Sequence, residues 1–414
     1  MTAAVIWSED YLAYRWTHTH PMNPVRLALT MSLAHTLGVL DDVEISPPLD
    51  ISDDVLTLVH GRDYIDAVRA LGSGTASLSG PLLERIFGLG DADNPVFDGM
   101  HDAARILVGG TVAAAQAVAG GSVRRAVNIG GGMHHAMRSR AAGFCIYNDC
   151  AVAIRWLLDN GYDRIAYIDV DAHHGDGVQT EFIGDPRVLT VSLHQHPATL
   201  WPGTGWPTEV GEGDGHGSAV NIALMPQTSD QLWLRAFHAV VPSLIAEFRP
   251  QILISQCGAD SHRADPLTDL SLTVDGQRAA MIAMRELAEK YCEGRWIAVG
   301  GGGYGVVDVV PRSWAHLLAV VLDRDVDPAT EIATSWCATA EHIATQVHSE
   351  YSQPPVGVMG DGGNVDYIGW DGDTGQPPPP GISESAQRQT DRAIMATRTA
   401  VFPLHGLDPE DPRD

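Results

Sequence analysis

The sequence predicts an α/β fold in which a mostly parallel central sheet carries helices on both faces. Three observations support this prediction. Short apolar runs alternate with helical patterns along most of the 414 residues. The run at residues 165–168 is apolar throughout, as expected of a strand that is covered on both faces. Polar side chains directly follow several of the runs, and ligands of open α/β sheets gather at the carboxyl ends of the strands.

The N-terminal elements begin with a short buried strand at residues 3–7. Asn23-Pro24 predicts the start of a helix that ends at Gly38. Two short helical patterns lie within residues 53–71. Residues 72–98 are rich in glycine and aspartate, and we expect a long loop there. A helix of small residues is predicted over 99–119, followed by a strand over 125–129.

The alternation continues through the second half of the chain. Asn148 or Asp149 is expected to cap a helix that ends at Asn160-Gly161. Further strands are predicted at 165–168, 188–193, 219–224, 251–256 and 296–299. Further helices are predicted at 178–183, 230–248 with Asp230 as the cap, 275–292 and 306–322. Beyond 323 the pattern weakens: residues 352–381 have the composition of a linker, and 383–400 predict one more helix.

Charge and cysteine content limit the classes of function. The chain has 26 Lys and Arg against 52 Asp and Glu, a net charge of −26, which argues against a direct nucleic-acid partner. Such acidity is typical of soluble proteins and would tolerate a cationic substrate. The five cysteines form no Cys-x-x-Cys pair, which indicates reduced thiols and a cytoplasmic location. We expect neither a signal peptide nor a membrane span.

Residues 164–177 carry the densest polar chemistry. An apolar run is followed by Asp169, Asp171 and His173, which on a continuing strand would point to one side. Two carboxylates and an imidazole form half of a metal site, because divalent cations prefer anionic oxygen and neutral imidazole nitrogen. The alternative is a polar strand end bridged by hydrogen bonds.

Three other predicted strand ends carry polar side chains, namely His134-His135, Asp260 and Tyr304. Each has a structural alternative: a turn satisfied by backbone carbonyls, a cap, or a core tyrosine with a bonded hydroxyl. Four polar strand ends at one edge of a sheet favour a catalytic site instead. The set as a whole predicts metal-assisted hydrolysis of an amide.

Each residue type suits one part of that chemistry. Asp171, His173 and Asp260 supply three ligands and leave a position for water and substrate, as a catalytic zinc site requires. The adjacent histidines can take a proton from the water and later return it to a leaving amine. Asp169 and Asp176 are available to orient these histidines. Tyr304 can donate a hydrogen bond to the oxyanion that forms on the attacked carbonyl.

These motifs resemble the zinc-dependent histone deacetylase superfamily, and most of all its bacterial acetoin-utilisation deacetylase-like members. The resemblance covers residues 7–322 and rests on several separate motifs. They are His20-Pro-Met-Asn-Pro-Val-Arg26, Gly88-Leu-Gly90 with Asp93-Asn-Pro95, Gly131-Gly-Met-His-His135, Gly143-Phe-Cys145, residues 168–177, Pro202-Gly-Thr-Gly205, Cys257-Gly-Ala-Asp-Ser261 and Gly300-Gly-Gly-Gly-Tyr304. The resemblance implies an arginase/deacetylase-type three-layer fold with about eight strands. It also implies a catalytic domain over 1–325 and a C-terminal extension over 326–414, with a Gly/Pro/Asp-rich linker and a terminal helix.

The resemblance further implies roles for single residues. Zinc, or iron(II) as the alternative ion, would bind Asp171, His173 and Asp260. His135, paired with Asp176, would be the main general base and acid, while His134, paired with Asp169, would assist electrostatically. Tyr304 would polarise the acyl carbonyl. Asp93 and Gly143 would contact the substrate, and Arg26 would line an internal channel behind the zinc. A potassium ion would lie near Asp169, Asp171, His173, Ser192 and Leu193.

The sequence also departs from the family pattern. Two facing aromatic residues, usually both Phe, form the acyl-lysine tunnel; here Phe144 matches one and Trp201 the other. Polyamine deacetylases of the superfamily carry a glutamate seven residues after the zinc aspartate, where this chain has Leu267. We therefore expect acetyl-lysine on a protein or peptide, and not an acetylpolyamine, as substrate. The resemblance to the bacterial branch implies a metabolic protein such as an acetylated acyl-CoA synthetase. The position of His262 is also unusual and has no explanation at the level of sequence.

Three other functions are compatible with parts of the pattern. An acetylpolyamine amidohydrolase is disfavoured by Leu267. A ureohydrolase with two manganese ions would need further carboxylates, but Gly175 stands two residues after His173 and Asp260 lacks a companion aspartate. A non-enzymatic acyl-lysine binder would be expected to lose a ligand or Tyr304, and all of them are present.

Overall fold

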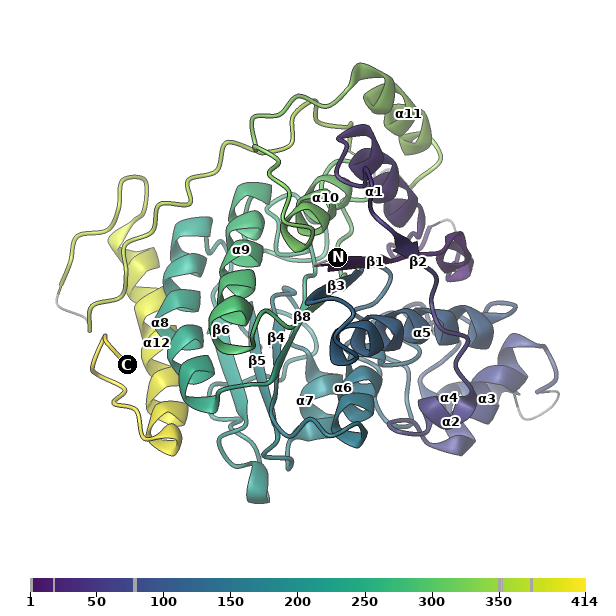
Figure 1. Cartoon of the computed structure of the whole chain (residues 1–414), viewed down its shortest axis with the longest axis horizontal. Helices are drawn as coiled ribbons and strands as arrows, with labels where there is room; N and C mark the ends of the chain where they lie inside the picture. The colour runs from purple at the N-terminus through teal and green to yellow at the C-terminus, as the bar shows by residue number, and fades with distance from the viewer. Residues whose placement is uncertain (1–2, 18, 77–79, 349–350, 352, 373–374) are drawn as a thin grey trace.

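The computed structural model describes residues 3–17, 19–76, 80–348, 351, 353–372 and 375–414 (Figure 1). Eight strands form one sheet in the order β2-β1-β3-β8-β7-β4-β5-β6. Every pairing between neighbouring strands is parallel. The strands are β1 (Ala3–Ile6), β2 (Ile45–Ser46), β3 (Arg125–Asn128), β4 (Ile165–Asp169), β5 (Val188–Gln195), β6 (Ala219–Leu224), β7 (Ile252–Gln256) and β8 (Trp296–Val299). The sheet is thus entirely parallel, where the sequence had predicted a mostly parallel one.

Helices lie on both sides of this sheet (Figure 1). On one side α12, α8, α9, α10 and α1 contact one another in that order, and on the other α5, α6 and α7 do so. The helices are α1 (Val25–Thr36), α2 (Asp53–Leu56), α3 (Arg62–Gly72), α4 (Gly80–Phe87), α5 (Met100–Ala119), α6 (Asp149–Asp159), α7 (Asp176–Phe182), α8 (Asp230–Phe248), α9 (Val274–Tyr291), α10 (Val310–Val321), α11 (Thr334–Ala344) and α12 (Glu384–Val401). The central strands β3, β4, β7 and β8 are buried along their whole length, which explains their mostly apolar sequences.

The sheet order places the four polar strand ends side by side. Strands β3, β8, β7 and β4 are consecutive in the sheet although they are far apart in the sequence. Their register aligns the last residues, with Asn128 opposite Val299, Val299 opposite Gln256, and Gln256 opposite Asp169. The segments that follow these residues therefore leave the sheet at one level and share one edge of the molecule.

Some predicted elements were wrong or incomplete. The expected loop over 72–98 contains α4, whose second residue, Pro81, is suited to the first turn of a helix. Two elements, β2 and α11, were not predicted. The N-cap of α8 is Ser229 and not Asp230. The Asp230 carboxylate instead accepts hydrogen bonds from the amide and the hydroxyl of Thr273, at 2.8 and 2.7 Å, and so joins the first turns of α8 and α9.

The C-terminal segment packs along the rest of the chain. Helix α11 contacts α1, and α12 contacts both α8 and the edge strand β6. The Thr397 hydroxyl donates a 2.6 Å hydrogen bond to the Asn221 carbonyl on that strand. Apolar side chains of the segment, including Trp336, Met359 and Phe402, belong to the same buried core as the sheet. The domain boundary at residue 325 stays a prediction.

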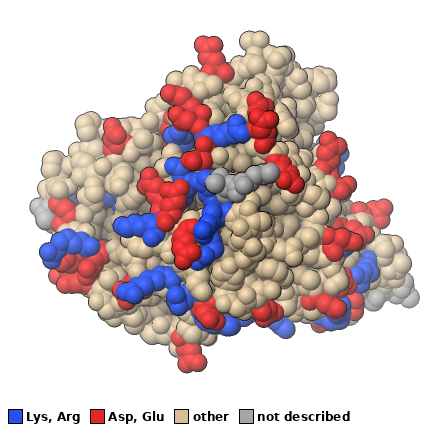
Figure 2. All heavy atoms as spheres, in the orientation of Figure 1, with Lys and Arg blue, Asp and Glu red and all other residues tan. Residues whose placement is uncertain are grey.

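Surface charges of both signs are mixed. On the face shown in Figure 2, Lys and Arg side chains lie among Asp and Glu side chains. Within the described ranges, no helix combines the length and apolarity needed to cross a membrane.

Candidate active site

Asp171, His173 and Asp260 meet at the carboxyl edge of the sheet. Asp171 and His173 lie in the turn after β4, and Asp260 lies in the turn after the neighbouring strand β7. The Nδ1 atom of His173 lies 3.0 Å from an Asp260 oxygen and 3.2 Å from an Asp171 oxygen. One ligand atom from each residue lies within 4.8 Å of the others, and no other group of this kind occurs in the described part of the chain. The sequence pattern predicts Asp169, Asp171 and His173 on one side of a continuing strand, but β4 ends at Asp169. The backbone turns after β4 and β7 bring Asp171, His173 and Asp260 together instead.

The surroundings of these carboxylates suit a divalent cation. Both are buried, and among the described residues only histidines form ion pairs with them. Burial and the nearby charge of Asp171 raise the pKa of Asp260 to about 7. Burial lowers the pKa of His173, but hydrogen bonds to Asp171 and Asp260 outweigh it and raise that pKa to about 10. The two carboxylates therefore attract positive charge. A proton on His173 supplies one such charge, and a divalent cation would supply two.

Backbone and amide donors fix the two carboxylates. Asp171 Oδ2 accepts hydrogen bonds from Gln256 Nε2 at 2.7 Å and from the Gly302 amide at 2.9 Å. Asp260 Oδ1 accepts one from the Ala172 amide at 2.8 Å. A Cβ atom on Gly302 would lie 2.2 Å from Asp260, so only glycine fits there. The remaining carboxylate oxygens point toward His173.

His134 and His135 lie beside this cluster, on the segment after β3. Each ring is oriented by its own carboxylate: His134 Nδ1 lies 2.7 Å from Asp169, and His135 Nδ1 lies 2.7 Å from Asp176. Since an ionised carboxylate only accepts hydrogen bonds, both Nδ1 atoms carry the proton and donate it. The ring centroids are 3.9 Å apart. The Nε2 atom of His134 lies 3.9 Å from an Asp171 oxygen, so this ring turns its second nitrogen toward the ligand cluster.

The two histidines differ in charge. Burial lowers the pKa of His134, but the charges of Asp169 and Asp171 outweigh it and raise that pKa to about 9. Burial, together with the positive charge of His134, lowers the pKa of His135 to about 4. At neutral pH His134 is therefore cationic while His135 is neutral and can accept a proton.

Tyr304 follows the glycine run after β8. This run is held in place, because the Gly302 amide donates a hydrogen bond to Asp171 and the Tyr304 amide donates a 2.8 Å hydrogen bond to Asp265. The Tyr304 side chain is buried. Burial and the charges of Asp260 and Asp171 raise the pKa of its hydroxyl well above the ordinary value. The hydroxyl therefore keeps its proton and can donate a hydrogen bond.

Two aromatic side chains border the candidate site. The ring of Phe144 packs edge-on against Tyr304, with centroids 5.6 Å apart. The indole of Trp201 packs edge-on against His135, with centroids 4.6 Å apart, and is 47% exposed. A Cβ atom on Gly143 would lie 2.7 Å from the Trp201 ring, so the glycine allows this close approach. Trp201 thus adjoins His135, and Phe144 adjoins Tyr304.

The other predicted site residues surround this centre. Arg26 is buried and donates a 2.8 Å hydrogen bond to the Gly303 carbonyl next to Tyr304. Asp93 is exposed, and its carbonyl lies 3.2 Å from His20 Nε2, whose ring packs against Phe144. Leu267 is half-buried in the turn after Asp260. Ser192 and Leu193 lie on β5, where Ser192 is opposite Asp169.

Comparison with known proteins agrees with this arrangement. The family model described as histone deacetylase domain matches residues 20–321. The chain is 45% identical to the acetoin utilization protein AcuC of Bacillus subtilis over 332 residues, which cover 80% of this chain and 84% of that protein. It is 36% identical to AcuC of Staphylococcus aureus (strain MSSA476) over 344 residues, which cover 83% of this chain and 87% of that protein. The chain belongs to the histone deacetylase family.

Solved structures support the same assignment. The crystal structure of an HDAC homolog from Aquifex aeolicus matches with a TM-score of 0.78 and 27% identity, covering 95% of this deacetylase and 100% of that chain. An HDAC homolog complexed with SAHA matches with a TM-score of 0.79, 27% identity and the same coverage. The AcuC-like resemblance and the arginase/deacetylase-type fold predicted from the sequence are confirmed, and the protein is a deacetylase.

Several residues that organise the deacetylase site were missed in the sequence. The Asp149 carboxylate accepts hydrogen bonds from the Gly132 and Met133 amides, at 3.0 and 2.7 Å, and so shapes the turn before the histidines. Asn148, not Asp149, caps α6. An aspartate in the first turn of a helix is so common that it gave no signal. Gln256 was detectable, since a polar residue that ends a buried strand needs a polar partner.

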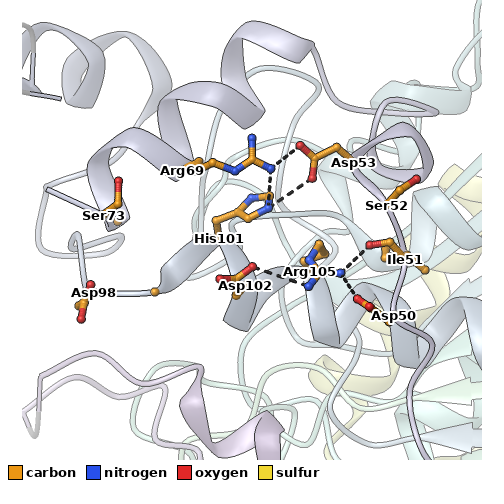
Figure 3. A pocket seen from close by; sticks show the side chains of 12 residues that line it. Asp50, Ile51, Ser52, Asp53, Arg69, Ser73, Asp98, His101, Asp102 and Arg105 are labelled. Carbon is orange, nitrogen blue, oxygen red and sulfur yellow. Dashed lines mark hydrogen bonds and ion pairs between the residues drawn. The ribbon is translucent and has the colours of Figure 1, made fainter. Parts of the chain in front are cut away.

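A surface cavity of about 680 Å³ lies elsewhere, between α2, α3 and α5 (Figure 3). Both of its arginines are already paired. Arg69 contacts Asp53 and His101, and Arg105 contacts Asp50 and Asp102. The cavity shares no residue with the deacetylase site. We assign it a structural role, because its ion pairs join the three helices.

Proposed function

We propose that this deacetylase hydrolyses the amide of N-acetyl-lysine in a protein or peptide, with zinc held by Asp171, His173 and Asp260. Iron(II) is the alternative ion. The observation that carries the proposal is the position of three convergent ligands beside a neutral and a cationic histidine. When bound, the metal ion would lower the pKa of a water molecule and polarise the acyl carbonyl.

The protein's own groups would move the protons. His135 is neutral, and its Nε2 atom can take a proton from water and return it to the lysine amine. Asp176 would hold its ring and stabilise the charged form. His134, cationic and held by Asp169, would lower the energy of negative charge that develops nearby. The Tyr304 hydroxyl would donate a hydrogen bond to the former carbonyl oxygen.

The surrounding residues would bind the substrate. Phe144 and Trp201 would enclose the lysine side chain, Gly143 would line the same passage, and Asp93 would bind the peptide backbone at the surface. Arg26, beneath Tyr304, would line the channel behind the metal. Potassium would bind near Asp169, Asp171, His173, Ser192 and Leu193, where β4 ends beside β5. We place the enzyme in the cytoplasm, acting on acetylated proteins such as an acyl-CoA synthetase.

Leu267 separates this proposal from its closest alternative. An acetylpolyamine carries a second, distant ammonium group, and a carboxylate at this position would bind it. Leucine offers no charge, and its amide is already bonded to Asp265 at 3.0 Å. A ureohydrolase would require a second metal cluster, and within the described residues there is one such group.

Hydrolysis of a fluorogenic acetyl-lysine peptide by zinc-loaded protein tests the proposal. Tyr304→Phe is expected to lower kcat by about 10²- to 10³-fold, because it removes one oxyanion donor. Tyr162→Phe, far from the site, is the matched control and should leave kcat unchanged. N8-acetylspermidine, offered as a competing substrate, should be hydrolysed poorly.

The other outcomes are equally informative. Turnover of the polyamine alone would show that the argument from Leu267 is wrong. Failure to hydrolyse both substrates, with zinc shown to be bound, would contradict the proposed function.

A further inference from the structure

The C-terminal segment reaches the turn that carries the metal ligand Asp260. Within it, Asp361 is almost completely buried, with 8% of its side chain exposed. Its Oδ2 atom lies 2.7 Å from His262 Nε2 and accepts a 2.9 Å hydrogen bond from the Val274 amide. Its Oδ1 atom accepts a 2.7 Å hydrogen bond from the buried Arg312. One aspartate of the extension thus joins three parts of the catalytic region.

The backbone around Asp361 is fixed as well. The amides of Asp361 and Gly363 both donate to the Asp275 carboxylate, at 2.7 and 3.1 Å. A Cβ atom on Gly363 would lie 2.1 Å from the Thr273 hydroxyl, so the segment lies directly against the start of α9. The backbone that carries Asp361 is therefore fixed independently of the hydrogen bonds that its carboxylate makes.

His262 connects Asp361 to the turn after β7. Its Nδ1 atom accepts a 3.1 Å hydrogen bond from the Ala264 amide, so the ring proton lies on Nε2 and is donated to Asp361. The backbone of His262 belongs to the same turn, since its carbonyl accepts a 2.8 Å hydrogen bond from the Asp265 amide. The orientation of the imidazole and the conformation of the turn are thus coupled.

The turn holds two groups of the proposed mechanism. Asp260 lies two residues before His262, and its carbonyl accepts a hydrogen bond from the Thr268 hydroxyl. Asp265, three residues after His262, accepts a 2.8 Å hydrogen bond from the Tyr304 amide. Hydrogen bonds, together with the short backbone of this turn, therefore connect the extension to a metal ligand and to the oxyanion donor.

We propose that Asp361 is a positioning residue of the active site, so that the C-terminal extension completes the catalytic centre. Through His262 it fixes the turn over residues 260–268, and through that turn the places of Asp260 and Tyr304. The inference rests on the proposed function for the roles of these two residues. It also accounts for His262, a residue that the sequence left unexplained.

Kinetics and zinc release of position-361 variants test this proposal. For Asp361→Ala we expect kcat on the acetyl-lysine peptide to fall about tenfold or more, with KM changed by less than about twofold, because a transition-state contact is displaced. Zinc should leave the variant faster on addition of a chelator. Asp361→Asn should show a smaller loss, because its amide oxygen can still accept from His262. Asp366→Asn, an exposed aspartate of the same segment, is the matched control.

A double-mutant cycle tests the route. If Asp361 acts through His262, the variant His262→Ala/Asp361→Ala should lose no more kcat than His262→Ala alone. In metal-free protein, the Tyr304 amide should exchange its hydrogen faster in Asp361→Ala than in the control. A purely structural role would lower the melting temperature but leave kcat, zinc release and amide exchange unchanged below it.

The outcomes separate the two proposals. A folded Asp361→Ala protein with wild-type kcat, zinc release and amide exchange would overturn the positioning role. If it fails to fold, Asp361→Asn is judged by the same criteria. If the wild type does not hydrolyse the peptide, the proposed function fails, while zinc release and amide exchange still decide the role of Asp361.

Discussion

At the scale of single residues, two histidines of the site differ in charge because their surroundings differ. His134 and His135 are neighbours in the sequence, and each is bonded to an aspartate. Their pKa values lie on opposite sides of neutrality because His134 also faces Asp171, whereas His135 faces the positive charge of His134. Two titratable groups shifted in opposite directions are typical of acid–base sites.

Trp201 gives a prediction at this scale. Its indole approaches Gly143 and His135, where a phenyl ring would occupy less volume. Trp201→Phe should keep deacetylation within about tenfold of wild type and raise kcat/KM for a butyryl-lysine peptide relative to the acetyl peptide by about threefold or more. Trp206→Phe, an exposed tryptophan of the same loop, should leave this ratio unchanged. An unchanged ratio in both variants would show that Trp201 does not limit the acyl group.

At the scale of elements, the extension protects the edge of the sheet. Strand β6 is an edge strand, and α12 lies along it and supplies the Thr397 hydroxyl to one of its carbonyls. Edge strands without such cover present unpaired backbone groups that promote aggregation. Arg398 on α12 binds the last residues of the chain, because its guanidinium donates hydrogen bonds to the carbonyls of Pro409, Asp408 and Asp411.

Replacing Arg398 tests how strongly the chain end is held. The side chain is fully buried and stacks on Phe402 and Trp370 at 4.0 and 4.4 Å. Arg398→Ala should lower the free energy of unfolding by about 3 kcal/mol, since it removes several charged hydrogen bonds and leaves their acceptors unsatisfied. The measurement is urea unfolding followed by circular dichroism. Arg392→Ala on the same helix is exposed and should change stability by less than about 0.5 kcal/mol. A similar loss in both variants would contradict a specific role for Arg398.

At the scale of the whole molecule, the proposed metal binding would be linked to folding. Asp171 and Asp260 are buried together, and burial and the charge of Asp171 raise the pKa of Asp260. A cation that binds only the folded state stabilises it by about 4 kcal/mol at a thousandfold excess over Kd. Removing the metal should therefore abolish activity and also lower the melting temperature.

Calorimetry with and without a chelator measures this effect. Adding zinc back should restore both the melting temperature and hydrolysis. Asp171→Asn should lose the zinc-dependent shift, whereas Asp230→Asn, a buried aspartate outside the site, should keep it. A shift of equal size in Asp171→Asn would place the stabilising ion elsewhere.

The sequence by itself determined the alternation of strands and helices and the polar residues that follow the strands after Asn128, Asp169, Gln256 and Val299. Such patterns depend on residues that are close in the sequence, so they can be recognised without a structure. What only the tertiary structure decided were partners far apart in the chain. His262 and Asp361 are 99 residues apart, and Asp149 lies 17 residues after the Gly132 amide that it binds. The sheet order, in which β7 lies next to β4, likewise brings Asp260 beside Asp171, and no local pattern encodes that order.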